Sequence, residues 1–326
     1  MKQIVSIGIL CNDSPKQFSW KKKPFVKQEL NQCYEFFSEC AEKNNFLTVI
    51  STIKNYSNGN LAKGWVFEKG KGKWKKIKSH KIEIALDKFK FSKKNNKLRK
   101  KIAKEIFLVN NPRLEIFCKD KWLLKKSFPK MVPKTFLAEN AADLEKAKSQ
   151  IFSTKIVIKP RYGLAGQKIR ILKKCRTIKL GGEKIVQEFL ESKNGIPELG
   201  INGRHDLRLI VLNGKIENCF VRKPAKHRLI ANVSKGGKAS ILRKKLPKKI
   251  VEIAKKIDSK MEKFGFRLYT ADFIKSRNRF YLIELNSKPS FLVFIDTKSK
   301  KEGKIFCRKF FGQARKELEK IKPSQS

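Results

Sequence analysis

The chain has 326 residues, enough for about two or three domains with buried cores. It contains 78 Lys and Arg against 29 Asp and Glu, a formal net charge of +49, yet 40% of its residues are hydrophobic and 24 are Phe. That hydrophobic share excludes an intrinsically disordered chain. No stretch approaches the ~20 apolar residues that a membrane span needs, so we expect a folded, cytoplasmic protein with no membrane partner.

The positive charge has two interpretations of similar weight. Such a field attracts polyanions, for example nucleic acid or an acidic peptide. It equally fits a lysine-biased composition, because the lysines are spread along the whole chain instead of forming one tail. The seven cysteines form no C-x-x-C pair, so neither a zinc ribbon nor a redox motif is supported, and reduced, buried thiols are expected.

The first part of the chain alternates strand-like and helix-like segments. The predicted elements are strands at 3–10, 46–53 and 81–86, a helix at 25–41, and a small hairpin at 64–67 and 74–77. This alternation predicts an open α/β domain over residues 1–108. No glycine-rich fingerprint follows the first strand, so the sequence does not support dinucleotide binding there.

Two capped helices are predicted next. Asp120 precedes a short helix at 121–127, and Asn140 precedes a second one whose apolar face holds Leu144, Ala147 and Ile151. Asp and Asn are favoured at this position because their side chains accept hydrogen bonds from the first free N–H groups of a helix.

A glycine-containing loop separates two strand-like segments, 155–159 and 168–172. Gly163 and Gly166 allow the loop PRYGLAGQ to fold over a bound group and to present backbone N–H donors to an anion. The signal is weak by itself, because any hairpin loop can contain two glycines.

Further strands carry two arginines. A buried strand is predicted at 184–190, and a hairpin at 206–212 and 215–222 turns at Asn213-Gly214. Arg208 and Arg222 lie on the hairpin strands, where an arginine usually needs an anionic partner.

Two amphipathic helices complete the pattern. The first begins at Pro247 and ends at Gly265, and the second runs from about 304 to 321, before a frayed tail at 323–326. Their apolar stripes predict core packing.

Between these helices lies a hairpin at 268–289, LYTADFIKSRNRFYLIELNSKP. A turn centred on Asn278 would place Asp272 opposite Glu284, and Asn286, two residues further on, would share their face. Two carboxylates and an amide oxygen suit a hard cation such as Mg²⁺. The alternative is a hairpin with ordinary polar decoration.

In combination these segments resemble the ATP-grasp superfamily, in particular its glutathione-synthetase-like and RimK-like carboxylate–amine ligases. The resemblance covers about 110–289, and the start of the chain is more distantly similar to the YheC/YheD-like group. It implies an α/β (α+β) ATP-grasp fold behind an N-terminal open α/β domain. The implied boundaries are 1–108, then 109–322 with subdomains 109–183 and 184–322, then the tail 323–326.

The resemblance also implies roles for nucleotide-binding residues. Lys121 in KDKWLL and Lys159 in IVIKP match the lysines that contact the phosphates, and RYGLAGQ, with Gly163 and Gly166, matches the loop that closes over them. The segment IVQEFL matches the strand and hinge that hold adenine. The implied contacts there are Glu188, Phe189 and Leu190, with Glu191 for the ribose.

The remaining implied residues are ligands and charge-binding groups. Arg208, Arg222 and Asn232 match binding and catalytic positions, and Asp272, Glu284 and Asn286 match the metal ligands, including the E-x-N spacing. RimK-type enzymes carry an arginine two residues before that asparagine, where this chain has Ile230.

The implied activity is an ATP- and Mg²⁺- or Mn²⁺-dependent ligase of the acid–amino-acid type, working through an acylphosphate. Its substrates would be a carboxylate, carried by a small molecule or a peptide, and an amine acceptor, and an acidic peptide or other polyanion would suit the charge. Two alternatives remain: a basic nucleic-acid-binding protein on an ATP-grasp shell, and an inactive ATP-binding homologue. The chain contains no G-x-x-x-x-G-K-[ST], which excludes a P-loop nucleotidase.

Overall fold

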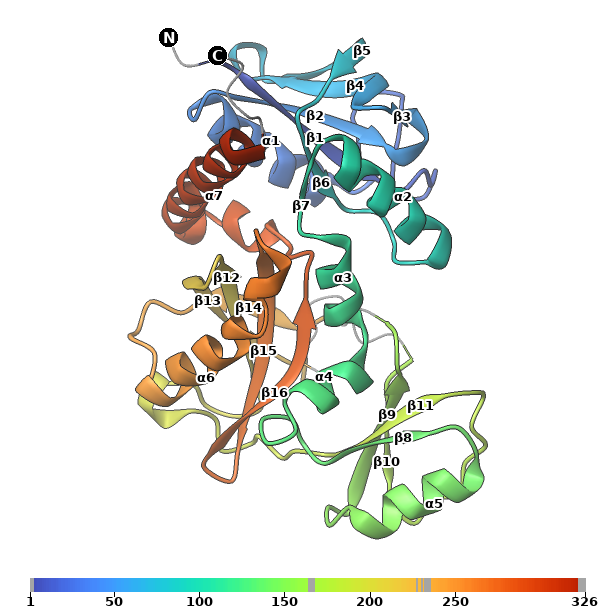
Figure 1. Cartoon of the computed structure of the whole chain (residues 1–326). Helices are drawn as coiled ribbons and strands as arrows, with labels where there is room; N and C mark the ends of the chain where they lie inside the picture. Colours follow the sequence, from blue (N-terminus) through green and yellow to red (C-terminus); the bar gives the residue numbers. More distant parts are fainter. Residues whose placement is uncertain (1–2, 164–167, 227, 230, 232–235, 322–326) are drawn as a thin grey trace. The chain divides into compact units, whose positions relative to one another are not determined.

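The computed structural model describes residues 3–163, 168–226, 228–229, 231 and 236–321 (Figure 1). The chain divides into two compact units, which we call unit 1 and unit 2. Unit 1 consists of Met1–Pro112 together with Ser290–Ser326, and unit 2 is the continuous segment Arg113–Pro289. Helices accompany three separate sheets, so the predicted α/β (α+β) class is confirmed. No helix within the described ranges is long and apolar enough to cross a bilayer.

Unit 1 is built on a seven-stranded sheet with four parallel strands in the order β2-β1-β6-β7 and three antiparallel strands at one edge. The strands are β1 (Val5–Cys11), β2 (Phe46–Thr52), β3 (Tyr56–Ser57), β4 (Asn60–Glu68), β5 (Lys73–Lys81), β6 (Ile84–Asp87) and β7 (Phe107–Val109), and the helices between them are α1 (Gln28–Glu42) and α2 (Lys93–Glu105). The predicted strands, helix and hairpin of this region are confirmed. No element is predicted from the sequence for α2, because Leu98 and Ile102 are its only large apolar residues among many lysines.

The last helix, α7 (Lys300–Ile321), packs within unit 1. Phe37 of α1 lies 5.1 Å, between ring centroids, from Phe311 and 6.0 Å from Phe310, and Phe46 of β2 lies 4.8 Å from Phe311. The predicted helix is therefore confirmed. Its residues belong to unit 1, whereas the predicted domain 109–322 includes them. The phenylalanine stripe indicates that α7 packs on a core, and nothing in the sequence says which one.

The first sheet of unit 2 has four antiparallel strands in the order β10-β9-β11-β8. Its strands are β8 (Thr135–Ala138), β9 (Lys155–Pro160), β10 (Arg170–Lys173) and β11 (Lys184–Glu188), and the helices of this region are α3 (Pro112–Lys119), α4 (Lys121–Ser127) and α5 (Ala141–Gln150). Both predicted caps are confirmed: Asp120 accepts from the N–H of Trp122 and Asn140 from the N–H of Asp143, each at 2.9 Å. The predicted apolar face of α5 packs with β9 and β11.

The second sheet of unit 2 has five strands in the order β14-β13-β12-β15-β16. They are β12 (Asp206–Leu212), β13 (Lys215–Lys223), β14 (Lys238–Ile241), β15 (Leu268–Ser276) and β16 (Arg279–Asn286), and α6 (Lys248–Ser259) belongs to the same core. The predicted turn between β12 and β13 is confirmed, because Asn213 and Gly214 both have positive φ, at 44° and 83°.

A β-bulge sets the register of the β15–β16 hairpin. The turn consists of Arg277 and Asn278, both with positive φ, so Ser276 pairs with Arg279. This turn alone would place Ile283 opposite Asp272. A register shift between Asp272 and Phe273 places Glu284 there instead. The predicted pairing of Asp272 with Glu284 is confirmed, and the predicted turn centred on Asn278 alone is corrected to a two-residue turn.

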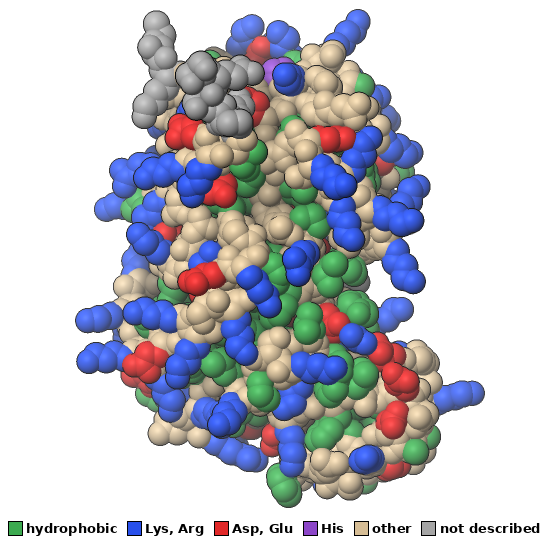
Figure 2. All heavy atoms as spheres, in the orientation of Figure 1, with side chains coloured by type: hydrophobic (Ala, Val, Ile, Leu, Met, Phe, Trp, Pro, Cys, Tyr) green, Lys and Arg blue, Asp and Glu red, His purple; other side chains and the backbone are tan. Residues whose placement is uncertain are grey.

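Positive charge is not confined to one surface. Figure 2 shows Lys and Arg side chains dispersed over the visible face, with Asp, Glu and hydrophobic side chains between them. This distribution matches the spread of lysine along the sequence and does not outline a single basic patch on that face.

Candidate functional site

Lys159, near the end of β9, is a buried lysine with one polar partner on the neighbouring strand. Its ammonium group donates to Oε1 of Gln187 on β11 at 2.8 Å, and the residue is 4% exposed. The pKa of Lys159 is lowered to about 7, mainly by burial and also by the positive charge of Lys121, while the carboxylate of Glu284 opposes both effects.

Lys121 is the first residue of α4. Its ammonium group donates to the carbonyl oxygen of Gly163 at 3.2 Å, and its backbone N–H donates to the carbonyl oxygen of Arg161, also at 3.2 Å. Burial lowers the pKa of Lys121, while the carboxylates of Glu284 and Asp120 oppose the shift. The structure thus places the first predicted phosphate lysine beside the start of the predicted glycine loop.

A third lysine, Lys119, joins the other two around Glu284. It is 2% exposed and belongs to the last turn of α3. Burial lowers its pKa, and Glu115 and Glu284 oppose this shift. We call Lys119, Lys121 and Lys159 the lysine cluster, because the carboxylate of Glu284 acts on the pKa of all three.

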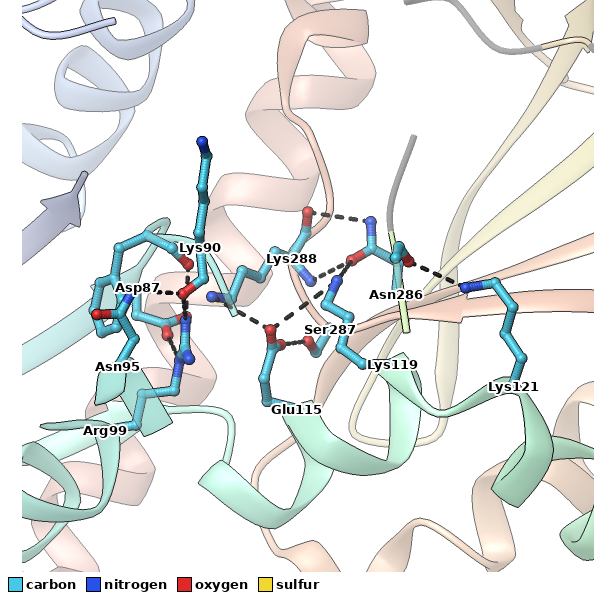
Figure 3. Close-up of polar contacts among 12 residues, drawn as sticks. Asp87, Lys90, Asn95, Arg99, Glu115, Lys119, Lys121, Asn286, Ser287 and Lys288 are labelled. Atoms are coloured by element: carbon cyan, nitrogen blue, oxygen red, sulfur yellow. Dashed lines mark hydrogen bonds and ion pairs between the residues drawn. The ribbon is translucent and has the colours of Figure 1, made fainter. Parts of the chain in front are cut away.

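The surroundings of Lys119 form a buried polar network that is not predicted from the sequence. Figure 3 shows the Lys119 ammonium directed at Oδ1 of Asn286, 3.4 Å away, and at Glu115, 4.0 Å away. Ser287 donates to Glu115, and the ammonium of Lys288 lies 3.5 Å from the same carboxylate. The only sequence signal for Lys119 is its position four residues after Glu115, a spacing that usually indicates an exposed ion pair on a helix.

Glu284 is half-buried on β16 and stands out among these groups. Within the described part of the chain its carboxylate forms neither a hydrogen bond nor a salt bridge. The negative charge of Glu284 therefore acts on three buried or half-buried lysines, although its carboxylate forms a hydrogen bond or salt bridge with none of them. Glu115 also acts on the pKa of Lys119 and Asp120 on that of Lys121, whereas Glu284 is the carboxylate that opposes the lowered pKa of Lys159.

Asp272 connects the two predicted arginines. Nε and Nη2 of Arg208 donate to its two carboxylate oxygens at 2.7 and 2.6 Å, and Nη2 of Arg222 donates to Oδ2 at 2.7 Å. Burial raises the pKa of Asp272, but the charges of both arginines outweigh burial and leave that pKa below its usual value. The anionic partner expected for the strand arginines is therefore a predicted metal ligand.

A second carboxylate completes this network. Nη2 of Arg222 also donates to Asp206, and burial together with the charge of Asp272 raises the pKa of Asp206 to about 7. Nε of Arg222 is buried and has no hydrogen-bond partner among the described residues. An unpaired guanidinium N–H at such a position is suited to an anionic ligand.

The predicted adenine-binding residues lie at the end of β11 and directly after it. The backbone N–H groups of Glu188 and Phe189 donate to the carbonyls of Lys134 and Lys155, whereas that of Leu190 makes no hydrogen bond within the described ranges. Glu191 accepts bonds from the next two backbone N–H groups and from Arg204 at 3.0 Å. Gly166, Asn232 and Ile230 lie outside the described residues. The roles assigned to all these residues stay predictions.

The predicted metal ligands differ in the number of hydrogen bonds that their side-chain oxygens accept. Asp272 accepts one bond on Oδ1 and two on Oδ2, and the carboxylate of Glu284 accepts none in the described structure. Oδ1 of Asn286 accepts from the backbone N–H of Lys288 at 3.1 Å and from the ammonium of Lys119 at 3.4 Å. Oxygen donors of this kind fit a hard cation that keeps several waters. No group of three or more His, Cys, Asp or Glu able to hold a metal occurs in the described ranges, and the predicted set contains only two such residues, Asp272 and Glu284, beside the amide of Asn286.

Comparison with protein families gives one match. The model described as "Prokaryotic glutathione synthetase, ATP-grasp domain" matches residues 121–296, more than half of the chain. The match begins at Lys121 and includes Lys159, Arg208, Asp272, Glu284 and Asn286. A comparison with curated protein sequences found no match.

Solved structures share the fold at low sequence identity. D-cycloserine synthetase DcsG superposes with a TM-score of 0.62 at 10% identity, covering 94% of this chain and 99% of the other. A RimK domain ATP-grasp protein from Sphaerobacter thermophilus gives 0.57 at 12% identity, covering 94% and 99%. D-alanine–D-alanine ligase from Bacillus anthracis, complexed with ATP, gives 0.56 at 14% identity, covering 96% and 99%. These similarities show the fold, and none of them singles out the YheC/YheD-like group.

Proposed function

We propose that this chain, which belongs to the family of prokaryotic glutathione synthetase ATP-grasp domains, is an ATP-dependent ligase that joins a carboxylate to an amine. The observation that carries the proposal is the lysine cluster around Glu284. Three ammonium groups, two arginines and a carboxylate without a hydrogen bond in the described structure fit a ligand that brings negative phosphate oxygens.

The proposed metal set is Glu284, Asn286 and Asp272. When bound by them, Mg²⁺ or Mn²⁺ supplies positive charge to phosphate oxygens as a Lewis acid. The chain's own contribution is the lysine cluster, whose ammonium groups would neutralise the negative charge of the phosphate oxygens. Because these lysines are buried or half-buried, their electrostatic effect is larger than that of surface lysines.

The reaction we propose has two steps. The substrate carboxylate attacks the γ-phosphate and releases ADP, which gives an acylphosphate, and the amine then displaces phosphate to form the amide. Phosphoryl transfer requires positioning and charge stabilisation more than a protein base. Arg222, with its unpaired Nε, and Arg208, held by Asp272, are suited to bind the anionic substrate or the intermediate.

The test of this proposal uses the intact protein. We expect ATP with Mg²⁺ to raise its melting temperature, because a ligand that binds only the folded state stabilises it. We then expect phosphate release from ATP when pools of amino acids or acidic peptides are added. A melting temperature that ATP and Mg²⁺ leave unchanged contradicts the proposal.

The polyanion-binding alternative rests on net charge alone. The visible face in Figure 2 shows dispersed lysines, and neither the family match nor the fold supports an acidic-peptide or polyanion partner. It predicts steeply salt-dependent binding to RNA or DNA that is independent of ATP. The inactive-homologue alternative predicts ATP binding without phosphate release for any substrate pool.

The lowered pKa of Lys159 leads to a separate prediction about proton uptake when ATP binds. With a pKa of about 7, this lysine is mostly neutral at pH 8, and phosphate binding favours its charged form. We expect ATP binding at pH 8 to take up about one proton, and less at pH 6, where the lysine is already charged. Calorimetry in buffers of different ionisation enthalpy measures the uptake. The Lys159→Met variant should lose it, and equal uptake by that variant would refute the assignment.

A further inference from the structure

One buried carboxylate, Asp120, connects the start of α4 with the end of β9. Its Oδ1 accepts from the backbone N–H groups of Trp122 and Leu123 at 2.9 and 3.1 Å, which caps α4. The same carboxylate receives a two-pronged bond from Arg161, with Nε on Oδ1 at 2.8 Å and Nη2 on Oδ2 at 2.6 Å. The hydroxyl of Tyr162 donates to Oδ2 at 3.1 Å. A helix cap alone needs none of these side-chain bonds.

The segment held by Asp120 in turn holds Lys121. The backbone N–H of Lys121 donates to the carbonyl of Arg161, and its ammonium group donates to the carbonyl of Gly163, each at 3.2 Å. Arg161 is further fixed through Nη1, which donates to Glu183 at 3.1 Å. The direction of the Lys121 ammonium therefore depends on a backbone segment whose position is set by the bonds to Asp120.

The charge state of Asp120 agrees with this role. Burial raises the pKa of the Asp120 carboxyl, but the bonds from Arg161 and from the N–H of Leu123 outweigh burial and leave that pKa below its usual value. Asp120 is therefore ionised at neutral pH, and its pairing with Arg161 is a charge-assisted, two-pronged bond of the strong and directional kind.

We propose that Asp120 and Arg161 form a clamp that positions Lys121 for phosphate binding. Asp120 is a positioning residue in this inference, because it acts through Lys121 and does not itself contact the nucleotide. The inference rests on the proposed function, which supplies the phosphate. It adds a pair that neither the sequence pattern nor the family match assigns to the site.

The chain offers a closely matched control pair. Asp258 of α6 accepts from Arg267 through Nε on Oδ1 at 2.8 Å and Nη2 on Oδ2 at 2.5 Å, and from the hydroxyl of Tyr269 at 3.1 Å. Asp258 is 5% exposed and Asp120 is 4% exposed. The two carboxylates thus share a two-pronged arginine bond, a tyrosine donor and a similar burial, but only Asp120 also accepts backbone N–H bonds, and the partners of Asp258 are not candidate site residues.

The experiment compares Asp120→Asn, Arg161→Gln, their double variant and Asp258→Asn. Asparagine keeps the helix cap, because its side-chain oxygen accepts the same backbone bonds, but it cannot form the charged fork with Arg161. The first measurement is the reactivity of Lys121 toward a small amine-acylating reagent in the nucleotide-free protein, read by mass spectrometry. The second is the Kd for ATP with Mg²⁺, read by calorimetry.

We expect Lys121 to react faster in both clamp variants and at the wild-type rate in Asp258→Asn. The Kd for ATP should rise about tenfold or more in Asp120→Asn and in Arg161→Gln, because small displacements of a charge-binding group are costly. The double variant should be no weaker than the worse single variant, since either change already breaks the fork. Asp258→Asn should leave the Kd within about twofold while lowering stability to a similar degree.

Two results would overturn the inference. One is an equal shift of Lys121 reactivity and ATP affinity in Asp120→Asn and Asp258→Asn, which would make Asp120 a purely structural residue. The other is additive effects of Asp120→Asn and Arg161→Gln, which would show that they do not act as one unit. Failure of the wild-type protein to bind ATP refutes the proposed function instead. Acylation of Lys121 in Arg161→Gln, which keeps the charge of Asp120, still decides whether the clamp positions Lys121.

Discussion

Replacing Glu284 by Gln should abolish the stabilisation of the protein by ATP and Mg²⁺ and reduce ATP-dependent turnover about thousandfold. The reason is the position of this carboxylate, which influences the pKa of every lysine in the cluster yet forms no hydrogen bond or salt bridge in the described structure. Removing its charge takes away a proposed metal ligand and breaks no side-chain hydrogen bond or salt bridge of the described structure. The nucleotide-free protein should lose only about 1 kcal/mol of unfolding free energy, because the lysines lose a nearby counter-charge.

The control for this prediction is Glu217→Gln, a half-buried glutamate on β13 of the same sheet. That variant should keep the full rise in melting temperature with ATP and Mg²⁺. Thermal unfolding with and without nucleotide, followed by a phosphate-release assay, measures both effects. If Glu284→Gln responds to ATP and Mg²⁺ as the wild type does, Glu284 is not a metal ligand.

Replacing Asp272 by Asn should destabilise unit 2 by about 3–5 kcal/mol, the cost of breaking a buried ion pair on one side. Asp272 is 2% exposed and accepts three bonds from Arg208 and Arg222. Without the negative charge of Asp272, the positive charges of Arg208 and Arg222 are less compensated and repel each other. Chemical denaturation measures the change in unfolding free energy of unit 2. It is followed by the fluorescence of Trp122, the one tryptophan in unit 2, in a protein whose other three tryptophans are replaced by Phe.

Asp206→Asn provides the comparison, and it should destabilise less. The pKa of Asp206 is raised to about 7, so this carboxyl is partly protonated at neutral pH, a form that Asn resembles. A carboxyl whose pKa is raised on folding stabilises the folded state. This contribution is fully present when the pH is below 3.8, the usual pKa of the group, and it is lost as the pH rises through about 7. Between pH 5 and 8 the wild type should therefore lose more stability than Asp206→Asn. A larger loss from Asp206→Asn than from Asp272→Asn at pH 7 would contradict the assigned protonation states.

Local chemistry made much of unit 2 predictable. Asp120 and Asn140 cap helices because their side chains accept bonds from nearby N–H groups, and Asn213-Gly214 turns a hairpin because both residues tolerate positive φ. Such signals involve only a few consecutive residues. Lys121 and Lys159 were placed by resemblance to a family, and the structure brings both within the electrostatic influence of Glu284.

Features that depend on distant segments were not predictable from the sequence. The pairing of Arg208 with Asp272 requires β12 to lie beside β15, which only the strand order of the sheet decides. The burial of Lys119 follows from packing around Asn286 and Ser287, since the spacing from Glu115 is equally typical of an exposed helix. The predicted pairing of Asp272 with Glu284 assumes a turn centred on Asn278. In the structure a two-residue turn and a bulge at Asp272 together produce that pairing.

The aromatic contacts between α1 and α7 also have a consequence for folding during synthesis. Phe37 and Phe46 contact phenylalanines of α7, so we expect residues 1–112 to complete their core only after α7 has been synthesised. Unit 2 is continuous and contains its own core clusters. We therefore expect unit 2 to fold first on the nascent chain, while the unfinished unit 1 exposes an apolar helix face that is prone to aggregation.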